Sequence, residues 1–93
     1  MKINFEPIST SIEQIIPFKT GYLILEDYYK FVGKSNLYFI ENDKIIWFAE
    51  VPAEDDVYTD FRLDQEYIIG FTWSCFMVKL SATGEIISSE FTK

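Results

Sequence analysis

The sequence predicts a small all-β protein, an antiparallel β-sandwich or flattened barrel of about eight or nine strands. Residues that favour strands dominate its 93 positions, and aromatic residues alone make up 18% of the chain. Polar turn segments recur about every ten residues, which is the spacing expected of hairpin-connected strands. The length leaves room for one folded unit, so we expect a single β domain over residues 1–93.

Nine short segments carry the strand pattern. In chain order they are Ile3–Phe5, Ile15–Phe18, Gly21–Leu25, Leu37–Ile40, Ile45–Val51, Val57–Leu63, Tyr67–Trp73, Cys75–Leu80 and Ile86–Phe91. Polar segments such as "ENDK" and "SATGE" lie between several of them, and their lengths are typical of hairpin loops. At most one short helical turn is expected, near the N-terminus, where Ser9 or Ser11 of "STSIEQII" can cap it.

In three of these strands the residue pattern predicts which faces are covered by the rest of the protein. Val57–Leu63 alternates with a period of two, which is typical of a strand with one face on a core and one in water. Its expected core residues are Val57, Thr59, Phe61 and Leu63, and its expected solvent-facing residues are Tyr58, Asp60, Arg62 and Asp64. Ile45–Val51 and Tyr67–Trp73 are apolar on both faces, so we expect central strands covered on both sides.

Two segments of the chain repeat one another. "LYFIENDKIIWFAEV" (37–51) and "VKLSATGEIISSEF" (78–91) each contain a strand, a polar turn, a charged residue with two isoleucines, and a second strand. The first copy keeps Trp47, and the second keeps the turn Thr83-Gly84. In form, the copies resemble the blade motif of quinoprotein-type (PQQ-like) β-propellers. The resemblance implies two blade-like meanders packed face to face, with the Trp as a packing residue and without a cofactor site.

The residue inventory argues against an enzyme, a cofactor site and a metal site. The chain has no histidine, which removes the commonest general base and the commonest metal ligand. Cys75 is the only cysteine, and its neighbours Trp73 and Phe76 predict a buried core thiol rather than a nucleophile. None of the four glycines stands in a phosphate-binding spacing.

Cysteine usage and hydropathy point to a cytoplasmic protein. A single cysteine cannot form an intramolecular disulfide, which favours a reducing compartment. The N-terminal segment lacks the apolar core of a secretory signal. The longest uncharged stretch, "YIIGFTWSCFMV", is too short to cross a bilayer.

Most of the net charge of −7 lies in one segment. Residues 50–66 hold seven acidic residues and one basic residue, Arg62, which leaves −6 in seventeen positions. Nucleic acids and anionic membranes require a basic surface, so neither is an expected partner.

The acidic segment predicts a basic protein as the partner. Its candidate binding residues are Glu54, Asp55, Asp56, Tyr58, Asp60, Asp64 and Glu66. In size and charge the chain resembles bacterial immunity proteins, and this resemblance implies neutralisation of a basic toxin, often a nuclease, by electrostatic complementarity. Tyr28 and Tyr29, like Tyr58, have polar neighbours and fit either a binding surface or the rim of the core.

Three alternatives remain open. The first is a sandwich or barrel that holds an apolar small ligand, because aromatic residues are plentiful. The second is a self-associating structural domain, a homodimer through an edge strand such as Ile86–Phe91. The third is an acidic strand that is only solvated, because charged outward faces keep β proteins from sticking together.

Overall fold

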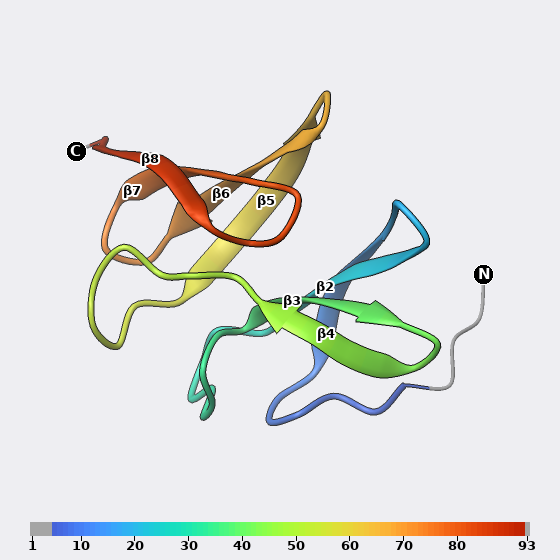
Figure 1. The fold of residues 1–93 in the computed structure, drawn as a ribbon. Coiled ribbons are helices and arrows are strands. Elements are labelled where there is room, and N and C mark those ends of the chain that lie inside the picture. The colour runs from blue at the N-terminus through green and yellow to red at the C-terminus, as the bar shows by residue number, and fades with distance from the viewer. Residues whose placement is uncertain (1–4, 93) are drawn as a thin grey trace.

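The protein is an all-β sandwich of two four-stranded antiparallel sheets (Figure 1), described over residues 5–92 of a computed structural model. The first sheet has the order β1-β2-β3-β4 and the second the order β5-β6-β7-β8. The strands are β1 Ile12–Phe18, β2 Gly21–Glu26, β3 Leu37–Glu41, β4 Lys44–Phe48, β5 Tyr58–Asp64, β6 Tyr67–Thr72, β7 Phe76–Leu80 and β8 Ile86–Phe91. Each sheet is a meander of neighbouring hairpins, so the predicted architecture of two meanders is confirmed.

Eight of the nine predicted strands form, and the ninth, Ile3–Phe5, falls at the N-terminus. Phe5 is not in a strand, and residues 3 and 4 lie outside the described part of the chain. The expected helical turn is absent from residues 5–92, because β1 already begins at Ile12 and pairs with Glu26 of β2. Backbone pairing with a neighbouring strand therefore overrides the local capping signal.

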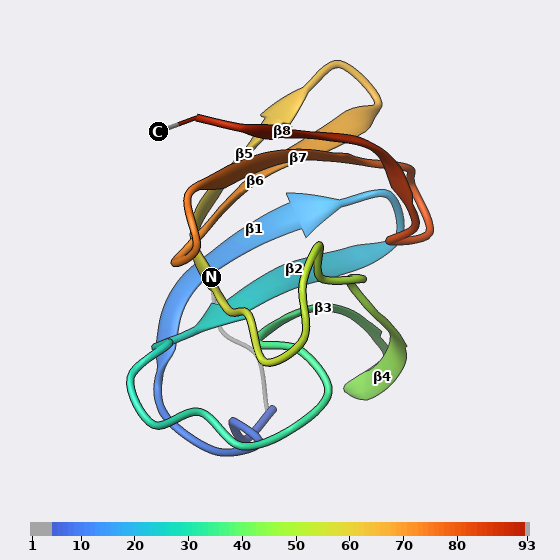
Figure 2. The same cartoon turned by 90° about the vertical axis from the view of Figure 1, so that its left-hand side faces the viewer.

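The main core fills the space between the two sheets, which lie as layers in Figure 2. Its buried residues come from both sheets: Phe18, Leu23, Leu25, Leu37, Phe39, Ala49, Tyr58, Phe61, Ile68, Val78 and Leu80. The two inner faces thus supply one continuous apolar cluster, which is the usual core of a sandwich.

The first sheet also buries its outer face. Ile24, Tyr38 and Ile40 form a second buried cluster, and Phe5 from the N-terminal segment packs against it. The fully buried Glu26 carboxylate fixes that segment by accepting hydrogen bonds from the backbone N–H groups of residues 8, 9 and 10 at 2.6–3.0 Å. The Tyr38 hydroxyl donates to the same carboxylate.

The inner strands of the first sheet are β2 and β3, so the prediction that Ile45–Val51 is a central strand is wrong. β4 ends at Phe48 and lies at the sheet edge. Its apolar residues are accounted for by two clusters, because Ile45 and Phe48 pack on the outer one and Trp47 on the inner one. β6 is an inner strand of the second sheet, as predicted, but it ends at Thr72 and leaves Trp73 in a turn.

The two halves of the repeat meet across the sandwich. A methyl group on Gly84, in the β7–β8 turn, would lie 2.4 Å from the Trp47 ring, so the indole rests directly on this glycine. Gly84 has a φ of +82°, which most side chains disfavour. The Glu50 N–H donates to the Gly84 carbonyl at 2.9 Å, which ties the inter-sheet connection to the same turn.

Candidate protein-binding site

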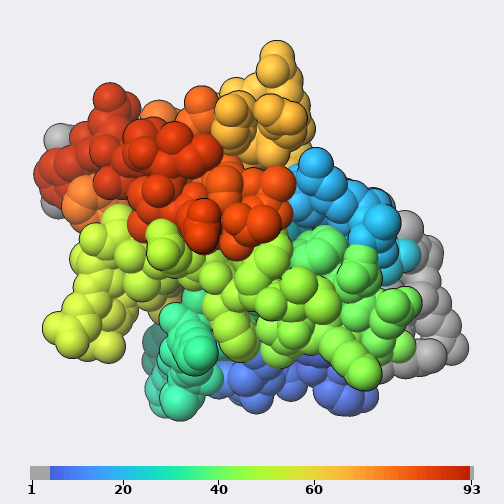
Figure 3. Space-filling model, viewed as in Figure 1, coloured from blue at the N-terminus to red at the C-terminus, as the bar shows by residue number. Residues whose placement is uncertain are grey.

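The structure divides the acidic segment between two distant places. Glu54 and Asp55 are exposed in the loop before β5, whereas Asp64 and Glu66 flank the tip of the β5–β6 hairpin. The seven-residue β5 separates them, and at the usual rise of a strand this corresponds to roughly 25 Å. In Figure 3 the hairpin tip projects at the top and the loop at the lower left. The candidate residues therefore do not form one surface.

Tyr58 is not on the surface, so its predicted outward position is wrong. The side chain is 0% exposed and belongs to the core between the sheets. A register shift between Tyr58 and Asp60 inserts Thr59 as an extra residue, so Tyr58 and Phe61 both face inward. The Tyr58 hydroxyl donates to the Glu50 carbonyl, and burial, with the charges of Asp56 and Glu50, raises its pKa well above the ordinary value.

Asp56 is also buried, at 7% exposure, and it organises the loop. One carboxylate oxygen, Oδ1, accepts the N–H of Val57 at 3.0 Å and the N–H of Ser74 at 3.2 Å. These bonds connect the loop before β5 to the turn after β6. The other oxygen, Oδ2, is buried and has no hydrogen-bond partner among the described residues.

Asp60 stands on the outward face of β5, as predicted, but one oxygen is already engaged. Its Oδ1 atom accepts a hydrogen bond from the Gln14 side chain of β1 at 2.6 Å and from the Phe61 N–H at 2.8 Å. Asp60 therefore joins the two sheets at their edges, and its carboxylate is less available to a partner than those of Glu54 and Asp55.

A surface groove rich in aromatic residues lies beside the acidic loop. It has a volume of about 460 Å³ and is lined by Tyr28, Tyr29, Lys30, Phe31, Asp55, Val57 and Trp73. We refer to these residues as the aromatic groove. The rings of Tyr28 and Trp73 stack with centroids 5.3 Å apart and planes inclined by 30°. Tyr29 is 66% exposed and Trp73 64%, which is unusual for side chains of this size.

Two hydrogen bonds hold the segments that build the aromatic groove. The β2–β3 loop is held by the Val32 N–H, which donates to the Ser9 hydroxyl at 2.9 Å. The β6–β7 turn is held by the Trp73 N–H, which donates to the Val57 carbonyl at 2.9 Å. The β2–β3 loop and the loop before β5 project side by side at the lower left of Figure 3.

A second hollow of about 200 Å³ continues from the aromatic groove. It shares Phe31, Asp55 and Val57 with the groove, and its remaining lining is Gly33, Lys34, Ser35, Val51 and Asp56. Asp56, whose Oδ2 atom is buried without a partner among the described residues, is therefore one of the residues that line this hollow, together with the cation of Lys34. An unpaired buried carboxylate oxygen is costly, and a positive charge brought into the hollow offsets that cost.

The electrostatics of this region favour a cationic ligand. Aromatic ring faces attract ammonium and guanidinium groups, and the Lys30 ammonium already lies 5.4 Å from the centre of the Tyr29 ring. Exposed Glu54 and Asp55 add negative charge at the rim. A side chain that combines an apolar stem with a cationic head, such as arginine or lysine, matches both features.

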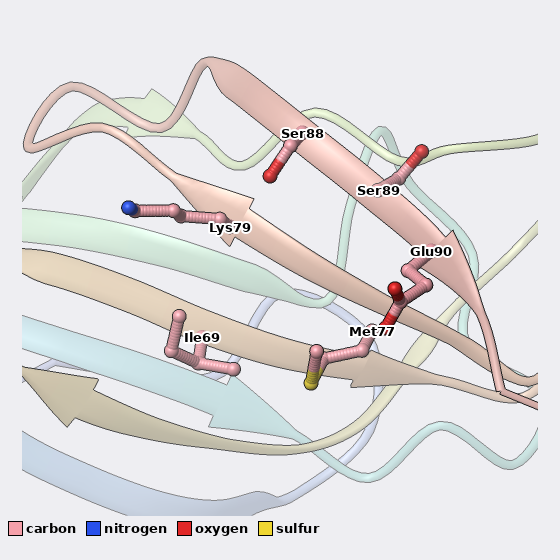
Figure 4. Close-up of a pocket in the computed structure, with 6 residues that line it drawn as sticks. All are labelled: Ile69, Met77, Lys79, Ser88, Ser89 and Glu90. Atoms are coloured by element: carbon pink, nitrogen blue, oxygen red, sulfur yellow. The ribbon is translucent and has the colours of Figure 1, made fainter.

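A third hollow, of about 270 Å³, lies on the outer face of the second sheet (Figure 4). It is lined by Ile69, Met77, Lys79, Ser88, Ser89 and Glu90. The nearby rings of Tyr67 and Phe71 are covered by the cations of Lys79 and Arg62, at 4.2 and 5.5 Å from the ring centres. This face thus uses its cations internally, whereas the aromatic groove keeps the Trp73 ring 64% exposed.

Within residues 5–92, no group of three or more His, Cys, Asp or Glu side chains gathers closely enough to hold a metal ion. Over the same range, no helix is long and apolar enough to cross a membrane. Cys75 is only half-buried and lies in the β6–β7 turn, so the prediction of a core thiol is wrong.

Comparison of the chain with protein-family models, with curated proteins and with solved structures gives no match in any of the three.

The sequence identifies the tyrosines of the aromatic groove as candidates but misses its tryptophan. Tyr28 and Tyr29 are candidates because their neighbours are polar. The sequence places Trp73 in a covered central strand, because it follows the apolar run of β6 without a turn residue such as Gly or Pro. Its placement depends on tertiary structure: β6 ends at Thr72, Trp73 lies in the β6–β7 turn, and its ring stacks on Tyr28 of the β2–β3 loop.

Proposed function

We propose that this protein is a non-enzymatic binding module whose partner is a basic protein. The observation that carries the proposal is the aromatic groove, in which exposed Tyr29 and Trp73 stand beside an acidic loop. Tyrosine and tryptophan are enriched at the energetic centres of protein interfaces. Within the groove, a lysine or arginine side chain of the partner lies against the rings and close to Asp55.

The finer form of the proposal is an immunity-type inhibitor that acts in the cytoplasm. A basic toxin, for example a nuclease, carries cationic side chains that bind the phosphates of its substrate. Carboxylates of the loop take the place of those phosphates, and the net charge of −7 speeds association with a cationic surface. Size, acidity and the absence of histidine support this form.

Two other functions have less support. An apolar ligand between the sheets has to compete with the side chains from both sheets that already form the core there. A purely solvated acidic strand accounts for the exposed positions of Asp64 and Glu66, but it does not account for stacked, exposed Tyr28 and Trp73.

The proposal is tested by capturing the partner from the native host and measuring its affinity for matched variants. We expect the double variant Asp55→Lys, Trp73→Leu to weaken binding by at least about 100-fold, because truncating two central contacts commonly costs about 2–4 kcal/mol. The hairpin-tip variant Asp64→Lys, Glu66→Lys makes twice the change in net charge. It should nevertheless weaken binding by less than about tenfold, and mainly at low salt.

The two variants separate a specific site from general acidity. If only the hairpin-tip variant loses affinity, the aromatic groove is not the binding site. If neither variant changes the affinity for a basic partner, or if the captured partner is not basic, the proposed function is wrong.

A further inference from the structure

The edge strand β8 differs from the other three sheet edges. β1 contains Pro17, β4 begins at Lys44, and β5 carries Asp60, Arg62 and Asp64. Prolines and charged side chains of this kind discourage an edge from pairing with another chain. β8 reads "IISSEF", with one charge and no proline, and five of its six residues are exposed.

The free side of β8 follows from its pairing with β7. The Thr92 N–H donates to the Cys75 carbonyl at 2.8 Å, and residues 88–91 pair with residues 76–79 in regular antiparallel register. Because successive backbone groups alternate in direction, the N–H and C=O groups of Ser89 and Phe91 point away from β7. They are available to a further strand.

The apolar side chains of β8 lie at the same edge. Ile87 is 50% exposed and Phe91 58% exposed. The Phe91 ring packs against Phe76, with centroids 5.5 Å apart, and more than half of it still faces solvent. Figure 4 shows the side chains of Ser88 and Ser89 pointing to opposite sides of β8, as alternation requires.

We infer that β8 is a self-association edge, at which two copies of this chain pair antiparallel about a two-fold axis through Ser89. In this register Ser89 lies opposite Ser89 of the second copy, and Phe91 lies opposite Ile87 of the second copy. Both exposed apolar residues are then covered. The outward backbone groups of Ser89 and Phe91 gain partners, and the two second sheets become one continuous eight-stranded sheet.

The charges of β8 are compatible with this register. Glu90 lies opposite Ser88 of the second copy, so no like charges face each other directly. Lys79 pairs with Ser88 in β7, so one row across the interface runs from Lys79 through Ser88 to Glu90 of the second copy. Moving the two-fold axis by two residues, from Ser89 to Phe91, shifts the register by four and would leave both copies of Ile87 uncovered.

A disulfide test reads this register directly. In a Cys75→Ser background, Ser89→Cys places two thiols on the axis, at a Cα separation of about 5.5 Å that suits a disulfide. Ser88→Cys is the matched control, because its two copies are offset along the strands and lie about 8 Å apart. We expect Ser89→Cys to form the covalent dimer at least about tenfold faster than the control.

Light scattering on the unmodified chain provides the second readout. We expect the mass to rise toward twice the chain mass between micromolar and millimolar concentrations. Ser89→Pro should remain monomeric, because proline removes the outward N–H that pairing with the second copy uses. It should still fold, because this N–H is not used in pairing with β7, and near-ultraviolet circular dichroism checks that it does. Ile87→Lys serves if the proline variant does not fold. A monomeric mass throughout, or equal cross-linking of Ser88→Cys and Ser89→Cys, overturns the inference.

Discussion

Asn36 joins the two sheets through one fully buried side chain. Its amide nitrogen donates to the carbonyl of Glu26 at 2.9 Å and to the carbonyl of Tyr58 at 2.7 Å. Its amide oxygen accepts the Tyr58 N–H at 2.8 Å. Only an amide of this length supplies both donors and an acceptor, so neither an aspartate nor a leucine can replace it.

The Asn36→Leu variant should lose about 3 kcal/mol of unfolding free energy, because three buried backbone groups lose their partner. Equilibrium urea unfolding measures the loss. Ser88→Ala, at an exposed position, is the control and should stay within about 0.5 kcal/mol of the unmodified protein. If the unfolding midpoint of Asn36→Leu equals that of the control, the link between the sheets contributes little.

Glu26 fixes the N-terminal segment over the outer face of the first sheet. Burial alone would raise the pKa of this carboxyl group. Hydrogen bonds from Tyr38 and from the N–H groups of Thr10, Ile8 and Ser9 outweigh that effect and hold the pKa below its ordinary value of 4.5. The ionised form is therefore the one that the fold stabilises.

The lowered pKa of Glu26 predicts that the fold loses stability in acid. A carboxyl group with a lowered folded-state pKa stabilises the fold above pH 4.5, and the contribution disappears as the pH falls toward the folded-state pKa. Glu26→Gln should thus be less stable than the unmodified protein at pH 7, and the difference should shrink below about pH 4. Urea unfolding over this pH range measures it. A difference in unfolding free energy that is constant with pH would exclude the ionisation of the Glu26 carboxyl group as its source.

Among the elements, the β7–β8 turn is the point where the two meanders depend on each other. Trp47 of β4 rests on Gly84, and the Glu50 carboxylate accepts the Ile86 N–H at 2.8 Å. The two copies of the sequence repeat thus complete one contact, the first with its tryptophan and the second with its glycine.

Gly84→Ala should destabilise the protein by about 2–4 kcal/mol, because a methyl group collides with the indole of Trp47 and the positive φ becomes strained. Thermal unfolding followed by circular dichroism measures the effect. Thr83→Ala, in the same turn but with an exposed side chain, should cost less than about 1 kcal/mol. Equal losses for both variants would place the effect in the turn and not in the Trp47 contact.

Strands could be predicted from the sequence because alternation and turn residues are local signals. The boundaries of Ile86–Phe91 agree with β8, and those of Leu37–Ile40 differ from β3 by one residue. The prediction of which side chains face the core was wrong where the backbone departs from regular pairing, because the extra residue at Thr59 turns Tyr58 inward. A bulge leaves no simple trace in composition, so the burial of Tyr58 could not be read from the alternation of its strand.

The candidate site was less accessible to prediction for a different reason. Exposed acids and tyrosines could be identified one by one, but their grouping depends on contacts between distant segments. Tyr28 and Trp73 are 45 positions apart and stack only because the sandwich brings the β2–β3 loop to the β6–β7 turn. The acidic segment, by contrast, is continuous in sequence and is split in space by the length of β5.

The folded protein therefore presents two acidic regions of different character. The hairpin tip with Asp64 and Glu66 is a solvated end of a sheet, and the loop with Glu54 and Asp55 borders the aromatic groove. General attraction of cations acts at both places, and the groove adds the exposed rings of Tyr29 and Trp73. A cationic probe should distinguish them.

The most direct measurement is an NMR titration of the isotope-labelled protein with a short arginine-rich peptide. We expect the largest chemical-shift changes at the backbone amides of residues 28–31 and 55–57 and at the Trp73 indole. The amides of residues 64–66 should change little, and Trp73→Leu should abolish the changes at the groove. Shifts that are largest at the hairpin tip, or that persist at the groove in Trp73→Leu, would contradict a binding site built on the aromatic groove.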